Sequence, residues 1–164
     1  MSPPRHVSVT PATQALRRAG IPYGEHLYEY VDHGGTGEAA QQLGVDEGRI
    51  IKTLLMQDER GKELIILMHG NCSVSTRNLA RAIGVKSVSP CTPEQAQRAT
   101  GYRVGGISPF GTRKRLPVYV EHTVLSLPRL LINGGHRGYL LEIEPAVLSS
   151  LLGATAVECA LKEP

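Results

Sequence analysis

The chain has 164 residues, of which 41% are hydrophobic and 20% are charged, so its composition suits one packed domain and argues against disorder along most of its length. No apolar run approaches the roughly 18 residues of a membrane span, and the N-terminal residues lack the apolar stretch of a secretion signal, so we expect a cytoplasmic protein without a membrane partner. The net charge of +3 permits a polyanionic partner without requiring one.

The first half of the chain predicts alternating helices and strands. Residues 1–9 show no periodicity and are expected to form a flexible tail before a single domain over residues 10–164. A helix is predicted to begin at Thr10, a suitable N-cap before a proline, and to end at Gly20. Next we expect a strand over 26–31, a helix over 38–43 and, between Ser75 and Ile83, a second capped helix.

The remaining elements follow from capping residues and from clusters of β-branched and apolar residues. Further helices are predicted from Thr92 to Gly101 and from Pro145 to Leu152. Further strands are predicted near 50–56, 63–68, 85–89, 102–105, 117–121, 129–133, 139–143 and 155–160. Strands outnumber helices, which favours an α+β (mixed α/β) domain on a mixed, mostly antiparallel sheet that is partly closed into a barrel.

The three cysteines and six histidines carry no pattern of a metal or disulfide site. Cys72, Cys91 and Cys159 are odd in number and widely spaced, which fits neither a disulfide framework nor paired zinc ligands. The histidines form no metal-binding motif. We therefore expect free thiols and no metal ion.

A lysine lies within the apolar segment IIKTLLM. Strand alternation places Lys52 on the same face as Ile50, Leu54 and Met56. The side chain could cover the sheet and extend its ammonium to water. Alternatively, the ammonium could line a pocket and hold an anionic or carbonyl oxygen.

The segment TGYRVGGISPFGTRKRLP, residues 100–117, has the densest cluster of glycine, proline and basic residues. Gly105 and Gly106 would let the backbone approach a ligand closely, although a simple turn between strands explains them as well. Ser108 has no G-x-S-x-G context and no visible His–Asp partners, which disfavours a serine hydrolase.

Two further features could meet an anionic ligand. The run Arg113-Lys114-Arg115 could contact phosphates or could be a solvated charge run. The segment INGGHRG, residues 132–138, joins two apolar strands, and its composition by itself predicts a hairpin turn.

In this order, IIKTLLM, TGYRVGGISPFGTRKRLP and INGGHRGYLLEI resemble the YbaK family of Cys-tRNA(Pro) deacylases. The resemblance covers nearly the whole chain. It implies the single-domain fold that is also inserted in bacterial prolyl-tRNA synthetases for editing. It also implies translation quality control in the cytoplasm, with proline tRNA as substrate, prolyl-tRNA synthetase as partner and no metal or organic cofactor.

The resemblance assigns roles to individual residues. Lys52 matches the family's essential lysine and is the catalytic candidate. Around the aminoacyl end, the matching pocket residues are Tyr28, Gly105, Gly106, Ile107, Ser108, Pro109, Gly134 and Gly135, and Asn133 is a pocket candidate in the second of these turns. From their charge and their place beside these motifs, the candidates for contact with tRNA phosphates are Arg113, Lys114, Arg115 and Arg137. Asn133 stands where many relatives have Ser, His136 stands where many have Lys, and the turn before Glu38 lacks a Phe that some members carry. These departures leave the accepted amino acid open.

The expected reaction is trans-editing of mischarged Cys-tRNA(Pro), in which the substrate's own thiol attacks the aminoacyl carbonyl. Lys52 and the N–H groups of residues 105–107 would stabilise the developing charge. Two alternatives remain. The domain could clear alanine or another small residue from tRNA by water attack, or it could bind tRNA or a synthetase without catalysis.

Overall fold

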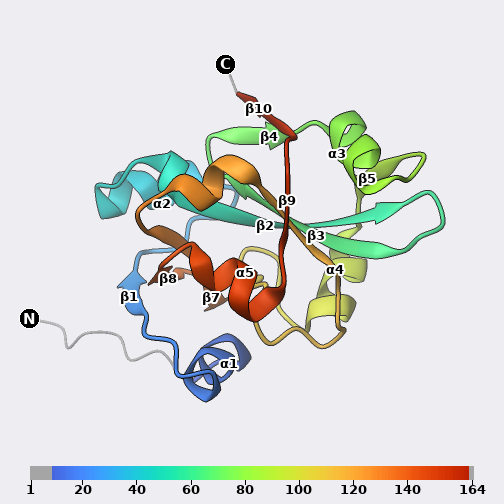
Figure 1. Ribbon diagram of the computed structural model, residues 1–164. Coiled ribbons are helices and arrows are strands. Elements are labelled where there is room, and N and C mark those ends of the chain that lie inside the picture. The colour runs from blue at the N-terminus through green and yellow to red at the C-terminus, as the bar shows by residue number, and fades with distance from the viewer. Residues whose placement is uncertain (1–8, 163–164) are drawn as a thin grey trace, which may run out of the picture.

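A mixed β-sheet organises residues 9–162, the part of the chain that the computed structural model describes (Figure 1). The strands are β1 (Gly24–Leu27), β2 (Ile50–Asp58), β3 (Glu63–His69), β4 (Cys72–Val74), β5 (Val88–Pro90), β6 (Val118–Glu121), β7 (Leu130–His136), β8 (Tyr139–Ile143), β9 (Thr155–Val157) and β10 (Ala160–Lys162). The helices are α1 (Pro11–Arg18), α2 (Gly35–Leu43), α3 (Thr76–Ile83), α4 (Pro93–Thr100) and α5 (Ala146–Leu152), with short 3-10 helices η1 (Glu47–Arg49) and η2 (His122–Ser126).

The strand order in the main sheet is β1-β8-β7-β2-β3-β6-β9, and β5 pairs with β2. β7 with β2, β3 with β6 and β6 with β9 are parallel pairs, whereas the other pairs of this sheet are antiparallel. This confirms the predicted mixed, mostly antiparallel sheet. In the described residues the path runs from β1 at one edge to β9 at the other, so the predicted barrel closure is not confirmed.

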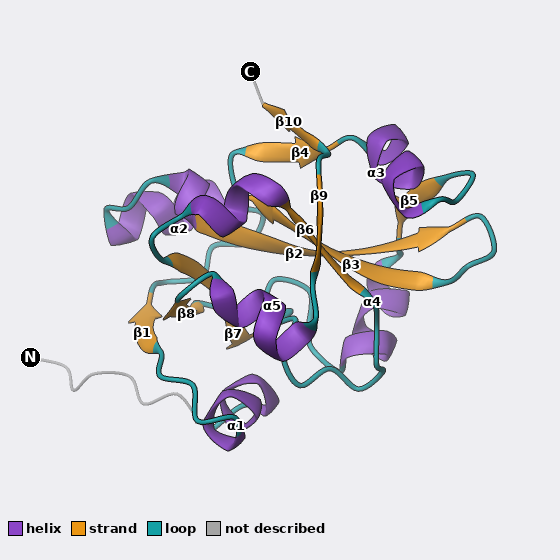
Figure 2. Ribbon diagram, in the orientation of Figure 1, coloured by secondary structure: helices purple, strands orange, loops and turns teal. Residues whose placement is uncertain are grey.

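Helices cover both faces of the sheet (Figure 2). Buried residues of α1, α4 and α5, such as Leu16, Ala96 and Leu148, share one hydrophobic cluster with the strands. On the other face, α2 packs over Ile50, and α3 packs in a separate cluster with Met56. Helices α2 and α3 therefore cover different parts of the β2 face that carries Ile50 and Met56.

Local sequence signals determine most helix ends. The Thr10 and Thr92 hydroxyls each accept a hydrogen bond from the third residue of the following helix, forming the predicted N-terminal caps. Ser75 caps α3 in the same way. Gly44 and Gly153 end their helices in the left-handed conformation that glycine adopts without a steric penalty.

Several strand predictions were wrong in position or type. β1 covers Gly24–Leu27 in place of 26–31, because its partner β8 begins at Tyr139 and leaves residues beyond Leu27 unpaired in the sheet. Residues 102–105 form turns. The expected strand 85–89 is β5, and the expected strand 155–160 is divided into β9 and β10. No sequence pattern predicted β4, which pairs with β10. The predicted tail, residues 1–9, lies outside the described residues except for Val9.

A buried carboxylate ties the C-terminal strands to the sheet. Glu121, at the end of β6, is 1% exposed and accepts hydrogen bonds from the backbone N–H groups of Cys159 and Ala160 at 2.8 and 3.0 Å. It also accepts bonds from the N–H and hydroxyl of Thr123. Burial alone would raise the pKa of the Glu121 carboxyl, but the N–H groups of Cys159 and Thr123 and the other donors hold that pKa below its usual range.

Replacing this carboxylate is expected to destabilise the domain. Glu121→Gln should lower the free energy of unfolding at pH 7 by about 1–3 kcal/mol, because one amide cannot accept all four hydrogen bonds. Since the folded pKa lies below the unfolded one, the stabilisation is present above the ordinary carboxyl pKa and is lost as pH falls through the folded value. Urea titrations should therefore show the parent and the variant converging in acid. Glu158→Gln, at an exposed neighbour, is the control, and equal stability of Glu121→Gln and the parent at pH 7 would contradict this role.

Among residues 9–162, none of the helices combines the length and the apolar character that crossing a bilayer requires.

Candidate active site

The candidate site forms where β2 lacks a neighbouring strand. One edge of β2 pairs with β3 from Ile51 to Gln57. The other edge pairs with β7 at residues 50–51 and with β5 at residues 56–58, and the described pairings leave residues 52–55 of that edge without a strand partner. A cavity of about 590 Å³ opens there, and Lys52 and Thr53 are among its lining residues.

Three distant segments form the walls of this cavity. They are the β1–α2 loop with the start of α2, the β5–α4 connection, and the loop after α4 together with the β7–β8 turn. Apart from β2, the lining residues are Tyr28, Tyr30, Val31, Asp32, His33, Gly35, Thr36, Glu38, Ala39, Pro90, Cys91, Thr92, Pro93, Ala96, Val104, Gly105, Ile107, Asn133, Arg137 and Leu140. A volume in this range accommodates a ligand of drug or nucleoside size.

Lys52 supplies a cation to the cavity. Its Nζ donates a hydrogen bond to the Cys72 carbonyl oxygen at 2.5 Å, which connects β2 to β4. Its neighbours on the same face, Ile50 and Met56, pack beneath α2 and α3 respectively, so the predicted alternation is confirmed. The half-buried Lys52 lines the cavity, where its ammonium can meet a carbonyl or anionic oxygen.

Two tyrosines of the β1–α2 loop, Tyr28 and Tyr30, line the cavity. Burial raises the pKa of Tyr28, and the neighbouring Tyr30 raises it further, so Tyr28 stays protonated at neutral pH and can donate a hydrogen bond. The Arg137 guanidinium stacks over the Tyr30 ring at 4.7 Å from its centroid and donates to the Val104 carbonyl oxygen at 2.9 Å. Arg137 therefore links the β7–β8 turn to the β1–α2 loop at the cavity.

Glycines 105 and 106 let two loops approach each other. A Cβ on Gly105 would lie 2.8 Å from the Tyr30 hydroxyl, and its φ of +92° lies in the left-handed region. A Cβ on Gly106 would lie 2.9 Å from the backbone nitrogen of Arg137. The missing side chains of both glycines thus leave room for the neighbouring loops, and Gly105 also lines the cavity.

Asn133 holds the β7–β8 turn in its conformation and connects it to the loop at Gly105. Its Oδ1 accepts hydrogen bonds from the N–H groups of Gly135 and His136 at 2.7 and 3.2 Å, across the bulge between β7 and β8. Its Nδ2 donates to the Gly105 carbonyl oxygen at 3.2 Å. Gly134 and Gly135 pack behind the turn and do not line the cavity, since a Cβ on Gly134 would lie 2.7 Å from the ring of Tyr139.

Adding one methyl group at the loop contact should therefore be costly. Gly106→Ala is expected to lower the free energy of unfolding by about 1–3 kcal/mol and to reduce activity, because a backbone nitrogen occupies the space for the new Cβ. Gly37→Ala in α2 is the matched control: its Cβ would meet Glu47 at an ordinary 3.7 Å, and alanine favours a helix. Denaturant titrations of both variants test this contact, and equal stability of the two would contradict it.

Ser108 and Pro109 are buried within the loop and do not line the cavity. The Ser108 hydroxyl accepts a hydrogen bond from the Phe110 N–H at 3.1 Å, and the Tyr102 hydroxyl donates to the Phe110 carbonyl oxygen at 2.5 Å. Burial is the main reason why the pKa of Tyr102 rises to about 12. These contacts hold the loop from inside, whereas Ile107, from the same motif, reaches the cavity.

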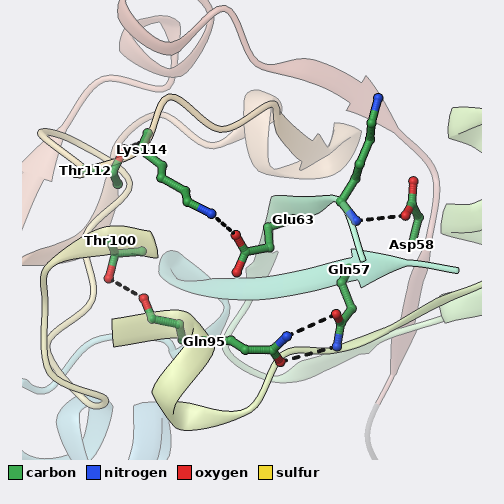
Figure 3. Close-up of polar contacts among 9 residues, drawn as sticks. Gln57, Asp58, Glu63, Gln95, Thr100, Thr112 and Lys114 are labelled. Carbon is green, nitrogen blue, oxygen red and sulfur yellow. Dashed lines mark hydrogen bonds and ion pairs between the residues drawn. The ribbon is translucent and has the colours of Figure 1, made fainter. Parts of the chain in front are cut away.

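The predicted phosphate-binding run lies away from the cavity lining. The Lys114 ammonium forms an ion pair with Glu63 at 2.8 Å, as Figure 3 shows. The backbone N–H groups of Arg113 and Lys114 donate to the last carbonyl groups of α4, at Thr100 and Ala99. The segment therefore completes the C-terminus of α4, and the Arg113 and Arg115 side chains are exposed.

The anchoring of α4 explains how the β5–α4 wall is held. The side-chain amides of Gln57 on β2 and Gln95 on α4 exchange hydrogen bonds at 3.2 and 3.3 Å (Figure 3). Gln95 also accepts a bond from the Thr92 N–H at 2.7 Å. This pair positions Pro93 and Ala96 over the cavity.

Two residues of the cavity lining, Thr53 and Cys91, were missed by sequence reasoning. The Thr53 hydroxyl is buried and has no hydrogen-bond partner among the described residues. Cys91 is partly buried, and its burial, with a smaller effect of Glu63, raises the pKa of its thiol. Cys91 belongs to no recognisable motif. Thr53 lies within IIKTLLM, but strand alternation assigns it to the face opposite Lys52.

Together, the open edge of β2, the mainly apolar cavity and the cation at its wall define a domain that holds a small group bearing a reactive carbonyl or anionic oxygen. Residues 34–151 match the model of the aminoacyl-tRNA editing domain, and the chain belongs to this family. The predicted editing-domain identity is thereby confirmed.

Named relatives agree with this family. The chain is 29% identical over 155 residues to the Enterococcus faecalis protein named "Putative Cys-tRNA(Pro)/Cys-tRNA(Cys) deacylase EbsC", covering 94% of each chain. It is 29% identical over 90 residues to a proline–tRNA ligase of Acidithiobacillus ferrooxidans, covering 55% of this chain and 16% of the ligase. A crystal structure described as that of "a putative trans-editing enzyme for prolyl tRNA synthetase" has a TM-score of 0.79 at 27% identity, covering 96% of this chain and 100% of that one.

Proposed function

We propose that this chain is a trans-editing deacylase that removes cysteine from mischarged proline tRNA in the cytoplasm. The observation that carries the proposal is the Lys52 ammonium on the open edge of β2, at the wall of a mainly apolar cavity. The match in full length to a relative named as a Cys-tRNA deacylase supports the substrate class. The likeness to part of a proline–tRNA ligase supports prolyl-tRNA synthetase as a partner.

In this proposal the substrate provides its own nucleophile. The cysteinyl sulfur attacks the ester carbonyl carbon, the bond to the ribose oxygen breaks, and the thiol proton ends on that oxygen. An aminoacyl ester is already activated, so the protein's task is to position it and to stabilise developing charge. Lys52 fills the second role, while Tyr28 and Ile107 bound the aminoacyl group.

The backbone N–H groups of residues 105–107 differ in whether they already have a partner within the loop. The Gly106 N–H donates to the Arg103 carbonyl oxygen at 2.8 Å, so it is occupied within the loop. The backbone of Gly105 and Ile107 remains in the proposal as a donor surface, since both residues line the cavity. Arg137 at the cavity and the exposed Arg113 and Arg115 remain proposed contacts for tRNA phosphates, whereas Lys114 is partly neutralised by Glu63.

The test is a comparison of mischarged substrates. Cys-tRNA(Pro), Cys-tRNA(Cys) and Ala-tRNA(Pro) are incubated with the protein, with and without prolyl-tRNA synthetase, and release of the amino acid is followed over time. We expect Cys-tRNA(Pro) to be cleared fastest in the presence of the synthetase. Faster clearance of Ala-tRNA(Pro) would indicate an alanine deacylase that uses water, and binding without release above the buffer rate would indicate a non-catalytic module.

A further inference from the structure

A second hollow lies on the α3–β5 side of the molecule. It has a volume of about 500 Å³ and is lined by polar and basic residues of α3, by the start of β5 and by the loop that joins them. Arg77, Arg81 and Lys86 provide three cations, and the hydroxyls of Thr76 and Ser87 provide neutral donors. Arg77 and Arg81 are four residues apart on α3, so both project from one side of the helix.

In the described part of the chain, the three side-chain cations of this hollow are not neutralised by ion pairs, although the Glu59 carboxylate lies nearby. All three cations are exposed, and within residues 9–162 none of them forms an ion pair. Residues 64–93 contain no Asp or Glu. Glu59 accepts bonds from the Lys86 and Ser87 N–H groups, but it lies outside the lining of the hollow.

This hollow leads to the candidate active site along β5. Val88, at the start of β5, lines the hollow, and Pro90, at its end, lines the cavity. Two residues of extended strand span about 7 Å, which is close to the phosphate spacing of an extended nucleic-acid strand. Figure 1 shows α3 beside β5, on the opposite side of the molecule from α1.

We propose that the surface formed by Arg77, Arg81 and Lys86 binds the phosphate backbone of the RNA whose aminoacylated 3′ end occupies the cavity. The proposal rests on the proposed deacylase function. Exposed cations with no carboxylate partner and with hydroxyl donors at their side match phosphate oxygens. Contacts to phosphate oxygens carry no base identity, so this surface provides affinity with little sequence preference.

The experiment compares a long and a short substrate. Arg77→Gln/Arg81→Gln is assayed on full-length Cys-tRNA(Pro) and on 3′-cysteinyl adenosine, which has no phosphate, and tRNA binding is measured over a range of salt concentrations. Loss of two phosphate contacts should reduce the slope of log affinity against log salt by about 1.5. The adenosine ester should be cleaved at the parent rate, because it has no phosphate that could contact α3. Lys86→Gln should reduce the slope by about 0.7 to 0.9.

The matched control removes two exposed arginines from another helix. Arg17→Gln/Arg18→Gln in α1 changes the net charge equally on the opposite side of the molecule, and its salt slope should equal that of the parent. An equal slope in the α3 variant and the control would overturn the proposal, as would a loss of cleavage of the adenosine ester in the α3 variant. Failure of the parent to cleave either substrate would contradict the deacylase function itself, a result that the binding measurements distinguish from failure at α3.

Discussion

Lys52→Ala is expected to lose deacylation by a factor of about 10² to 10³ while keeping its fold. Removing one preorganised donor at a developing oxyanion has effects of this size. The structure adds a second role that must be separated from the first, because Lys52 also donates to the Cys72 carbonyl oxygen and so connects β2 with β4. Rates on Cys-tRNA(Pro) and urea titrations should therefore be measured on the same preparations.

A catalytic role and a structural role predict different outcomes for this variant. If the ammonium acts on the ester, kcat falls while the free energy of unfolding changes little. Lys62→Ala, at an exposed lysine in the β2–β3 turn, is the control for loss of positive charge and should retain the parent rate. Full activity in Lys52→Ala, or a loss fully explained by unfolding, would show that this lysine only covers the sheet.

The second large effect concerns the nucleophile. Cys-tRNA(Pro) should be cleared more than about 100-fold faster than the isosteric Ser-tRNA(Pro), because a thiol is a few per cent ionised at pH 7 and an alkyl hydroxyl is essentially never ionised there. The two side chains are close in size, so the difference isolates the reactivity of sulfur. Initial rates with both substrates at equal concentrations measure it, and equal rates would point to water or a protein group as the attacking species.

Cys91 makes a control on the protein's own thiols necessary. It lines the cavity, although no motif drew attention to it. Burial raises the pKa of its thiol, and Glu63 adds to this effect, so the reactive thiolate is disfavoured at neutral pH. Cys91→Ser should therefore retain activity on Cys-tRNA(Pro). Collapse of activity in a folded Cys91→Ser protein would indicate that the attacking thiol belongs to the enzyme and not to the substrate.

Features that depend on neighbouring residues in the chain could be predicted from sequence. The caps at Thr10, Ser75 and Thr92 need only a hydroxyl and the next helical turn, and the structure has all three. The position of Lys52 on its strand face followed from alternation alone. The prediction failed at residues 102–105, where Tyr102 is buried and bonds to the Phe110 carbonyl oxygen, so a strand-like composition forms a turn.

The cavity itself depends on contacts that no local pattern encodes. Its opening exists because β7 leaves β2 after two paired residues and β5 joins only at residue 56. The family resemblance named the two glycine motifs, but it could not say that Gly106 packs against the backbone at Arg137 or that Ser108 turns inward. Likewise, only the three-dimensional structure places Cys91 in the cavity lining.

The loop at Gly105 and Gly106 packs closely against the β7–β8 turn, and this contact between the two glycine turns limits how the shape of the cavity can change in evolution. A side chain gained at Gly106 would have to be matched by a shift of the backbone at residues 136–137, so single substitutions cannot reshape this side step by step. The facing wall, residues 31–36, is largely exposed and has more freedom to change. Selection for removal of a different amino acid from tRNA, in evolution or in the laboratory, should therefore change residues 31–36 first and leave the two glycine turns unchanged.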